Sequence, residues 1–268
     1  SKEHAIVLPA LLFAYDLLLG PGPPERRNPL RLLLYYVPML VMAGGYVGLR
    51  YHVLGKTAQQ GYYGSGFWAT MFTMCKVFVT YLRQLFVPIH LSVHYVVPVN
   101  ESFFELPVLG SVVVLGCLVT SAGLLVRRVP LYSFCVAWFF LSLAPVSNVI
   151  PIQALQGDRF LYLTLLAPVF GLSGLFAWSS RYRFRSGREA PLTILTVLMC
   201  LGLSGAVVLT VNRNRVWKNN FTLWSATVRE QPRSAIARNN LANCYHRRGD
   251  EELAIHHWKI ALTLEKKP

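Results

Sequence analysis

The sequence predicts an all-α protein, in which a polytopic bundle of membrane helices is followed by a soluble helical hairpin. Three observations lead to this fold class. Hydrophobic residues make up 54% of the chain and charged residues only 14%, whereas soluble domains carry about 25% charged residues. Several apolar stretches approach the length needed to cross a bilayer. After residue 212 the composition changes to that of soluble helices.

Six apolar stretches are predicted to span the membrane as helices. About 20 apolar helical residues, each rising about 1.5 Å, cross a hydrocarbon core of roughly 30 Å. The six stretches cover residues 5–20, 31–50, 106–126, 129–148, 160–178 and 190–211. Residues 1–212 are therefore expected to form one transmembrane domain.

A seventh long stretch, residues 67–91, is predicted to lie in the membrane interface. It carries Lys76 and Arg83, which are seven positions apart and so project from one helical face. If this stretch does not span, the arginine clusters of the short loops all fall on one side, as the positive-inside rule requires. These clusters are Arg26, Arg27 and Arg31; Arg127 and Arg128; and Arg181, Arg183, Arg185 and Arg188. An interfacial or re-entrant helix with its basic face toward the headgroups satisfies that rule.

This topology predicts a multi-pass integral membrane protein of the bacterial inner membrane or the endoplasmic reticulum. Residues 51–105, 149–159 and all that follow residue 212 then face the periplasm or lumen. The net charge of +14 would suggest nucleic-acid binding in a soluble protein. Here the basic residues lie mostly in short loops, where they set orientation, so membrane lipids are expected as partners and nucleic acid is not.

Residues 213–268 are predicted to form an outward-facing tetratricopeptide-repeat region, with one full repeat at 235–268. That segment has the length of such a repeat. Residues of the repeat signature stand at the expected spacings: Leu241, Tyr245, Gly249, Ala254, Trp258 and Ala261. Since a single repeat cannot bury its own face, further repeats are expected beyond Pro268.

Soluble-enzyme motifs are missing from the sequence. It contains no phosphate-binding loop, no zinc-protease motif, no nucleophile elbow and no dinucleotide-binding glycine pattern. The five cysteines form no CxxC pair, which indicates neither a zinc site nor a disulfide framework. We expect no metal and no cofactor.

Two charged pairs stand out at the predicted outer ends of helices, Lys2–Glu3 and Asp158–Arg159. Charged residues commonly mark helix ends at the membrane interface, and acids suit a helix N-terminus. Alternatively, both pairs face one cavity and hold an anionic lipid headgroup, because a cation beside a phosphate makes a charge-assisted contact and arginine does so bidentately. The residues alone leave both interpretations open.

Two further residues are candidates for the same site. Tyr162 follows Asp158 by four positions and would share its helical face. His94, in the segment "LSVHYVVP", either accompanies an aromatic residue of the membrane interface or contacts a headgroup or sugar.

Four segments resemble the transmembrane and tetratricopeptide-repeat proteins, which are multi-pass glycosyltransferases of the GT-C type. They read "SKEHAIVLPALLFAYDLLL", "YLRQLFVPIHLSVHY", "SNVIPIQALQGDRFLYL" and "RNRVWKNNFTLWSATVREQP". The resemblance covers essentially the whole chain and implies transfer of a sugar, mannose or similar, from a polyprenyl- or dolichyl-phosphate carrier. It also implies an acidic catalytic base in a first outer loop upstream of Ser1, so this chain is expected to be a C-terminal portion of such an enzyme.

The family's motifs fall on specific residues of this chain. Its Lys-Glu motif matches Lys2 and Glu3, and its "ERFLYLP" stretch matches residues 158–164, with aspartate in place of glutamate at 158 and threonine in place of proline at 164. Positive charge must meet the lipid phosphate as it departs, so Lys2 and Arg159 are expected to bind it. Glu3 and Asp158 would then orient these cations or bind sugar hydroxyls.

The implied partners are a lipid-linked sugar donor and a protein or peptide acceptor brought by the helical repeats. Two other functions fit the same composition. One is a membrane-anchored repeat scaffold without enzymatic activity, and the other is a transporter for a lipid-linked sugar.

Overall fold

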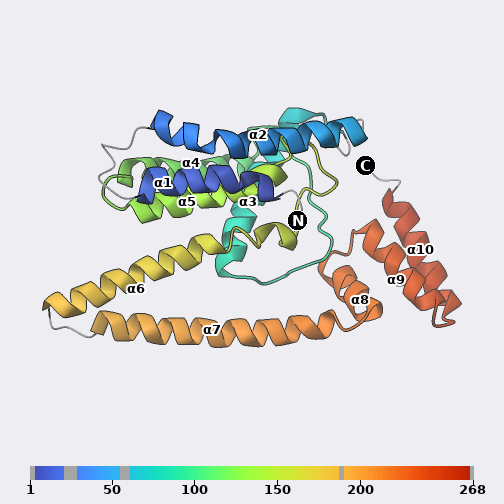
Figure 1. The fold of residues 1–268 in the computed structure, drawn as a ribbon. Coiled ribbons are helices and arrows are strands. Elements are labelled where there is room, and N and C mark those ends of the chain that lie inside the picture. Colours follow the sequence, from blue (N-terminus) through green and yellow to red (C-terminus); the bar gives the residue numbers. More distant parts are fainter. Residues whose placement is uncertain (1–3, 21–28, 55–60, 187–189, 266–268) are drawn as a thin grey trace. The chain divides into compact units, whose positions relative to one another are not determined.

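The computed structural model describes residues 4–20, 29–54, 61–186 and 190–265, and all regular secondary structure in these ranges is helical (Figure 1). The predicted all-α class is therefore confirmed. The chain divides into two compact units, one made of Ser1–Pro88 with Val97–Gly174 and the other of Ile89–Val96 with Leu175–Pro268. The boundary between them falls within helix α6.

The first unit contains the helices before residue 175. They are the 3-10 helix η1 (His4–Val7), α1 (Leu8–Leu19), α2 (Pro29–Leu54), α3 (Phe67–Phe86), α4 (Leu106–Leu125), α5 (Pro130–Leu143), the 3-10 helices η3 (Ala144–Val146) and η4 (Asp158–Leu161), and the start of α6 (Leu166–Ser186). The second unit contains the rest of α6, α7 (Ala190–Val216), α8 (Asn220–Glu230), α9 (Ala235–His246) and α10 (Glu251–Glu265).

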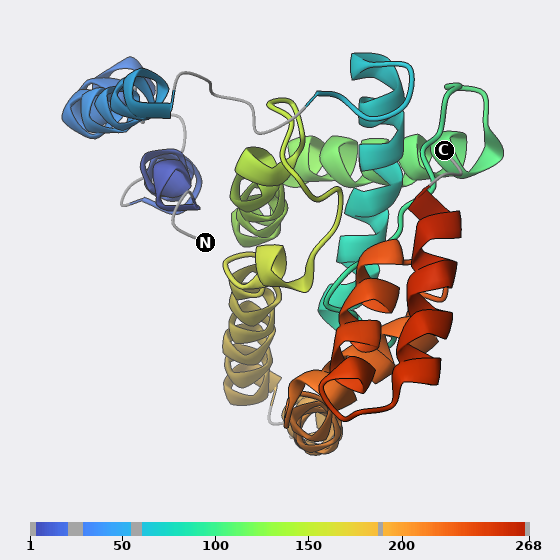
Figure 2. The same ribbon diagram turned by 90° about the vertical axis from the view of Figure 1, so that its right-hand side faces the viewer.

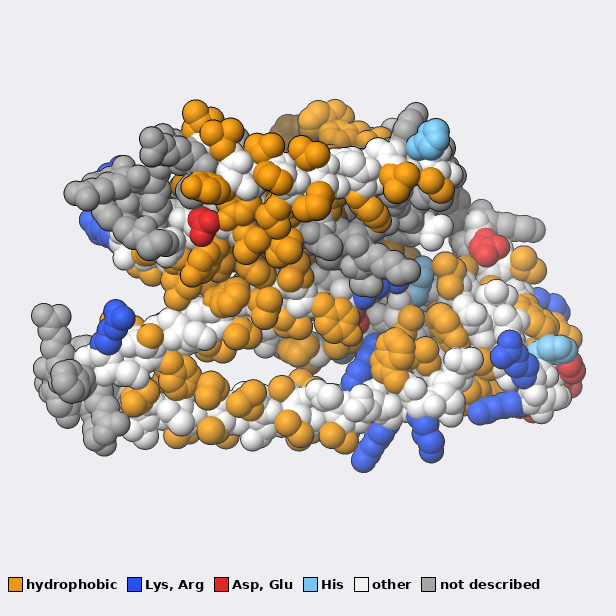
Figure 3. Space-filling model, in the orientation of Figure 1, with side chains coloured by type: hydrophobic (Ala, Val, Ile, Leu, Met, Phe, Trp, Pro, Cys, Tyr) orange, Lys and Arg blue, Asp and Glu red, His pale blue; other side chains and the backbone are white. Residues whose placement is uncertain are grey.

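Three described segments are long and apolar enough to cross a membrane, namely Leu106–Leu125, Asp158–Arg181 and Leu192–Val216. In the most apolar stretch of Leu192–Val216 no residue is buried. Apolar side chains line α7 in Figure 3. The other three predicted spans coincide with shorter apolar helices, Leu8–Leu19, Leu34–Leu49 and Pro130–Val146. The structure thus indicates membrane association, and a six-span bundle stays a prediction.

Helix α3 differs in direction from its neighbours in the first unit. It stands upright in both Figure 1 and Figure 2, whereas α1 and α5 lie along the width of Figure 1 and are seen nearly end-on in Figure 2. Its buried residues recur every three or four positions, which gives the helix one buried face. They are Ala69, Thr70, Thr73, Met74, Val77, Tyr81 and Gln84.

Close helix packing in both units depends on small side chains. In the first unit, a Cβ at Gly174 on α6 would overlap the side chain of Leu131 on α5. In the second unit, α9 and α10 form an antiparallel hairpin (Figure 2) whose alanines 237, 242 and 254 are completely buried. The turn between α9 and α10 contains Gly249 at φ 84°, a conformation that glycine adopts without strain.

The hairpin begins at a side-chain cap. The hydroxyl of Ser234 accepts a hydrogen bond of 3.0 Å from the backbone N–H of Ala237, in the first turn of α9. Serine is among the preferred residues for this position, because it satisfies one of the N–H groups that a helix start leaves without a partner.

Enlarging a hairpin alanine should loosen the second unit. The substitution Ala254→Leu forces a larger side chain into the completely buried α9–α10 interface, which we expect to cost about 1–3 kcal/mol. Hydrogen exchange of peptides from α9 and α10 in the full chain measures this loss of protection. The control Leu262→Ala, at a position that is 57% exposed on α10, should leave exchange nearly unchanged. Equal protection in both variants would contradict close packing of this hairpin.

Candidate functional site

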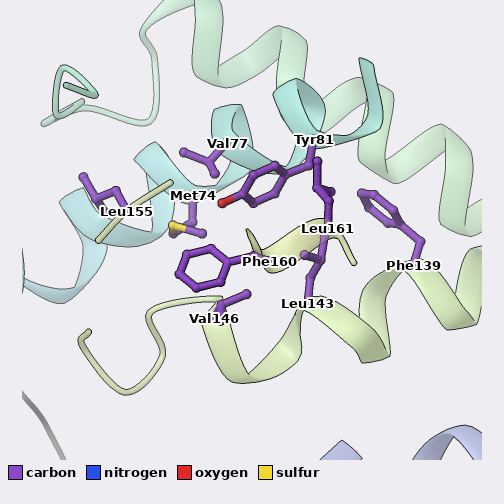
Figure 4. Packing of buried hydrophobic residues seen from close by; sticks show 9 residues of the cluster. All are labelled: Met74, Val77, Tyr81, Phe139, Leu143, Val146, Leu155, Phe160 and Leu161. Carbon is purple, nitrogen blue, oxygen red and sulfur yellow. The ribbon is translucent and has the colours of Figure 1, made fainter. Parts of the chain in front are cut away.

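The charged turn Asp158–Arg159 opens the 3-10 helix η4, and the residues that follow it anchor the turn in the core of the first unit. Phe160 and Leu161 are both buried and belong to a cluster with Met74, Val77 and Tyr81 of α3. Figure 4 shows these side chains converging between α3, η4 and the end of α5, which contributes Phe139 and Leu143. The apolar half of η4 thereby fixes the position of its charged half.

The loop before this turn is held by side-chain hydrogen bonds, because it has no regular structure of its own. The backbone N–H of Gly157 donates to the Tyr81 hydroxyl at 2.9 Å. Tyr81 is completely buried, so the bond is shielded from water. The hydroxyl of Tyr63 donates to the carbonyl of Ile152 at 3.1 Å. Backbone groups that leave regular structure need such partners when buried.

Asn148 organises the start of the same loop. It is completely buried and has φ 57°, in the left-handed region that asparagine tolerates better than most residues. Its Oδ1 accepts the N–H of Ile152 at 3.0 Å, and its Nδ2 lies 3.4 Å from the sulfur of Met74. The loop is therefore tied to α3 at both of its ends.

The predicted site residues of this turn lie at the surface. Arg159 is exposed, and its guanidinium carbon lies 5.1 Å from the centre of the Phe160 ring. Asp158 is half-buried in the first turn of η4, where a carboxylate suits the helix N-terminus. Tyr162 is 77% exposed. The structure thus gathers Asp158, Arg159 and Tyr162 around one short helix with a rigid base.

The other predicted site residues lie outside the described residues or in the second unit. Lys2 and Glu3 lie outside the described residues. His94 belongs to the second unit, where its Nδ1 lies 3.0 Å from the hydroxyl of Ser234, the residue that caps α9. That hydroxyl also accepts from the N–H of Ala237, and its own proton is free to be donated to an unprotonated Nδ1 of His94. Burial lowers the pKa of His94 and favours this neutral form.

The segment around His94 is attached to the second unit by further contacts. Arg213 of α7 donates to the carbonyl of Leu91 at 2.8 Å, and the N–H of Val96 donates to the side chain of Gln231 at 3.3 Å. The ring of His90 lies 3.1 Å from a carboxylate oxygen of Glu230. Residues 89–96 therefore form a strap on the start of the hairpin region.

Two acids of the loop before α4, Glu101 and Glu105, take part in local hydrogen bonds. The N–H of Ser102 and the amide of Asn100 donate to Glu105 and lower the pKa of its carboxyl, the Ser102 bond having the largest effect. The backbone and hydroxyl of Ser65 donate to Glu101. Both acids act as fixed hydrogen-bond acceptors in the loops beside α3.

No group of three metal-ligating His, Cys, Asp or Glu side chains occurs in the part of the chain that the structure describes. Comparison with known proteins found no match to this chain among protein-family models, curated proteins or solved structures.

Tyr81→Phe should destabilise the Asp158–Arg159 turn. The variant keeps the ring of Tyr81 in the core but leaves the N–H of Gly157 without its acceptor, which we expect to cost about 1–3 kcal/mol. Thermal unfolding of the full chain in detergent measures the loss. The matched control is Tyr62→Phe, which removes an exposed hydroxyl bond to the carbonyl of Val149. If both variants unfold at the wild-type temperature, Tyr81 does not hold the turn.

The second unit should lose stability as the pH falls below about 6.5, the ordinary pKa of histidine. Burial lowers the pKa values of both His94 and His257 in the folded chain; Arg238 and His256 add to the effect on His257. As the pH falls, the unfolded chain therefore binds protons before the folded chain does. The stability present above pH 6.5 is lost as the pH falls toward the pKa values of the two histidines in the folded chain.

His94→Gln should weaken this pH dependence, because glutamine accepts the Ser234 hydrogen bond without titrating. Hydrogen exchange of α9 and α10, corrected for the intrinsic effect of pH, measures it. An unchanged pH profile in the variant would show that His94 has no part in it.

Proposed function

We propose that this chain is part of a membrane glycosyltransferase of the GT-C type. It transfers a sugar, mannose or similar, from a polyprenyl- or dolichyl-phosphate carrier to a hydroxyl of a protein or other acceptor. The reaction takes place at the lumenal or periplasmic face of a multi-pass membrane domain. The catalytic base is supplied by a loop upstream of Ser1, and no metal or cofactor takes part.

The observation that carries the proposal is the placement of Arg159. Its exposed side chain extends from a turn that the buried Phe160, Leu161 and Tyr81 hold rigidly, and this turn is the start of the candidate span Asp158–Arg181. A lipid phosphate has its charged group at that level of a membrane. A guanidinium matches phosphate geometry bidentately, and a fixed cation stabilises charge that develops on a leaving group.

The other members of the site have defined parts in this proposal. Lys2 supplies a second cation to the phosphate, while Glu3 and Asp158 orient the cations or bind sugar hydroxyls. Tyr162, which is exposed on the same turn, and His94 contact the sugar or the headgroup.

The helices after α7 have the acceptor-binding role in this proposal. Helices α8, α9 and α10 form tetratricopeptide-type repeats, with one complete repeat at 235–268. The repeat assignment is supported by the antiparallel α9–α10 hairpin, which has completely buried alanines at its interface. Helix α3, which runs crosswise to α1 and α5, is the interfacial helix of the membrane domain.

A membrane-anchored scaffold is the second candidate function. Its support is a set of exposed aliphatic side chains on the hairpin, namely Ile236, Leu253, Ile255 and Leu262. An apolar surface of this kind is suited to packing against a further repeat or a protein partner. This function requires partner binding but no charged turn at residue 158.

Arg159→Ala in the full-length protein should lower kcat for sugar transfer roughly 10²-fold, as does removal of one group that stabilises developing negative charge. Arg159→Lys keeps the charge but not the bidentate geometry, so its kcat should lie between those of the wild type and Arg159→Ala. Transfer from a lipid-phosphate-linked sugar to a peptide acceptor, in proteoliposomes, measures the effect. Arg181→Ala is the matched control, because Arg181 is exposed near the other end of the same candidate span.

Three outcomes would contradict the proposal. Unchanged kcat in Arg159→Ala, with donor-dependent transfer by the wild type, rules out the phosphate role. Peptide binding without any transfer by the wild type supports the scaffold. Appearance of the lipid-linked sugar in the opposite leaflet without glycosylated acceptor indicates a transporter.

A further inference from the structure

Six aromatic rings form a continuous chain at the start of α3 and in the loop before α4. This aromatic strip consists of Tyr62, Phe67, Trp68, Phe72, Phe103 and Phe104. Successive ring centres lie 5.4, 5.3, 6.3, 5.8 and 5.7 Å apart in that order. Such distances are those of directly contacting rings, so two segments that are distant in the sequence form one surface.

Two rings of the aromatic strip are largely exposed and the other four are partly exposed. Phe104 is 81% and Trp68 is 69% exposed, although both side chains would be stabilised by leaving water. Soluble monomers rarely expose contiguous apolar patches of this kind, and such patches usually mark an interaction surface.

Polar contacts beneath the strip fix its two segments to each other. Lys76 of α3 donates to Oδ1 of Asn100 at 2.6 Å, and the backbone N–H of Asn100 donates to the hydroxyl of Thr73 at 2.9 Å. Ser65 hydrogen-bonds Glu101 through both its N–H and its hydroxyl. The strip is therefore a preformed surface that needs no rearrangement to bind.

These contacts also change the expected role of the basic face of α3. The sequence predicted that Lys76 points to lipid headgroups, but its ammonium contacts Asn100 and lies 3.5 Å from the carbonyl of Pro98. Lys76 joins two parts of the protein, so the aromatic strip rather than this lysine offers the surface for an external partner.

The location of the strip identifies the partner. Phe103 and Phe104 are separated only by Glu105 from the candidate span Leu106–Leu125, whose first residue is 81% exposed. Tryptophan and tyrosine are enriched where spans meet the headgroups, and the strip contains Trp68 and Tyr62. The other half of the strip lies on α3, which runs crosswise to α1 and α5 (Figures 1 and 2), as a helix in the plane of the interface would.

We propose that the aromatic strip inserts into the boundary between headgroups and acyl chains of the bilayer and holds α3 in the membrane plane. The inference rests on the membrane location in the proposed function and is independent of sugar transfer. The occupant is the lipid bilayer itself, and a protein or carbohydrate partner would leave the rings outside the lipid.

Depth-dependent quenching of tryptophan fluorescence tests the proposal. In the full chain, Trp68 is kept as the single tryptophan and the other five are replaced by phenylalanine. The protein is reconstituted into phosphatidylcholine vesicles that carry bromine either close to the glycerol or close to the chain ends. We expect the emission of Trp68 to be lost more strongly with shallow than with deep bromines and to be protected from aqueous iodide.

Two control variants separate this proposal from membrane insertion in general. A tryptophan-free chain with Leu201→Trp, near the middle of the candidate span Leu192–Val216, should be quenched best by deep bromines. A chain that keeps only Trp258, on α10, should not be quenched by either lipid. Quenching at position 201 without quenching of Trp68 overturns the aromatic strip as a lipid anchor. Absence of quenching at both positions overturns the membrane location as well.

A second measurement uses the wild-type chain, since replacing five tryptophans can impair folding. Vesicles containing a phospholipid with a photoactivatable carbene precursor near its glycerol should label peptides covering Tyr62–Phe72 and Phe103–Phe104, detected by mass spectrometry. Labelling of α7 without these peptides would overturn the proposal.

Discussion

The hydrogen bond from the N–H of Gly157 to the Tyr81 hydroxyl, and the apolar cluster around it, hold together the part of the molecule that carries the candidate site. The loop from 147 to 157 has no helix or strand that would pair its backbone groups. Side chains of α3 and of neighbouring loops pair them instead. Since unpaired buried backbone groups are costly, the charged turn has a defined position only as long as α3 has one.

Helix α3 therefore connects two surfaces of the first unit. Its buried face, with Met74, Val77 and Tyr81, supports the turn at Asp158. Trp68 and Phe72, nearer its start, belong to the aromatic strip, and Lys76 fixes the loop before α4. The two surfaces thus share one helix, so the bilayer position that we propose for the strip would also constrain the height of Arg159.

The sequence predicted what depends on hydrophobic periodicity and length. It indicated the apolar helices and a hairpin around Gly249, while the interfacial location of the stretch at 67–91 stays a prediction. It extended that stretch to residue 91, whereas α3 ends at Phe86, because Pro88 disfavours a helical conformation at Val87. It also began a regular helix at residue 160, where the structure has η4 and turns before Leu166.

Side-chain partners could not be predicted in the same way. Periodicity indicates that Tyr81 is buried, but nothing local to it names Gly157 as its partner. The same holds for Lys76 with Asn100 and for His94 with Ser234, since each pair joins residues that are distant in the sequence. The sequence offered His94 as a companion of an interfacial aromatic residue or as a headgroup or sugar contact, and the fold adds its contact with Ser234, which attaches residues 89–96 to the start of α9.

The hydrogen bonds of the irregular stretch between η4 and α6 determine whether it can lie in an apolar surrounding. The indole N–H of Trp138 donates to the carbonyl of Leu163 at 2.8 Å, and the N–H groups of Leu165 and Ala167 bond to carbonyls of the same stretch at 2.9 and 3.0 Å. In hydrocarbon, each unsatisfied backbone group costs several kcal/mol. Because these bonds satisfy the groups internally, the turn after η4 tolerates an apolar surrounding without unwinding, while the charged residues Asp158 and Arg159 before it stay at the surface.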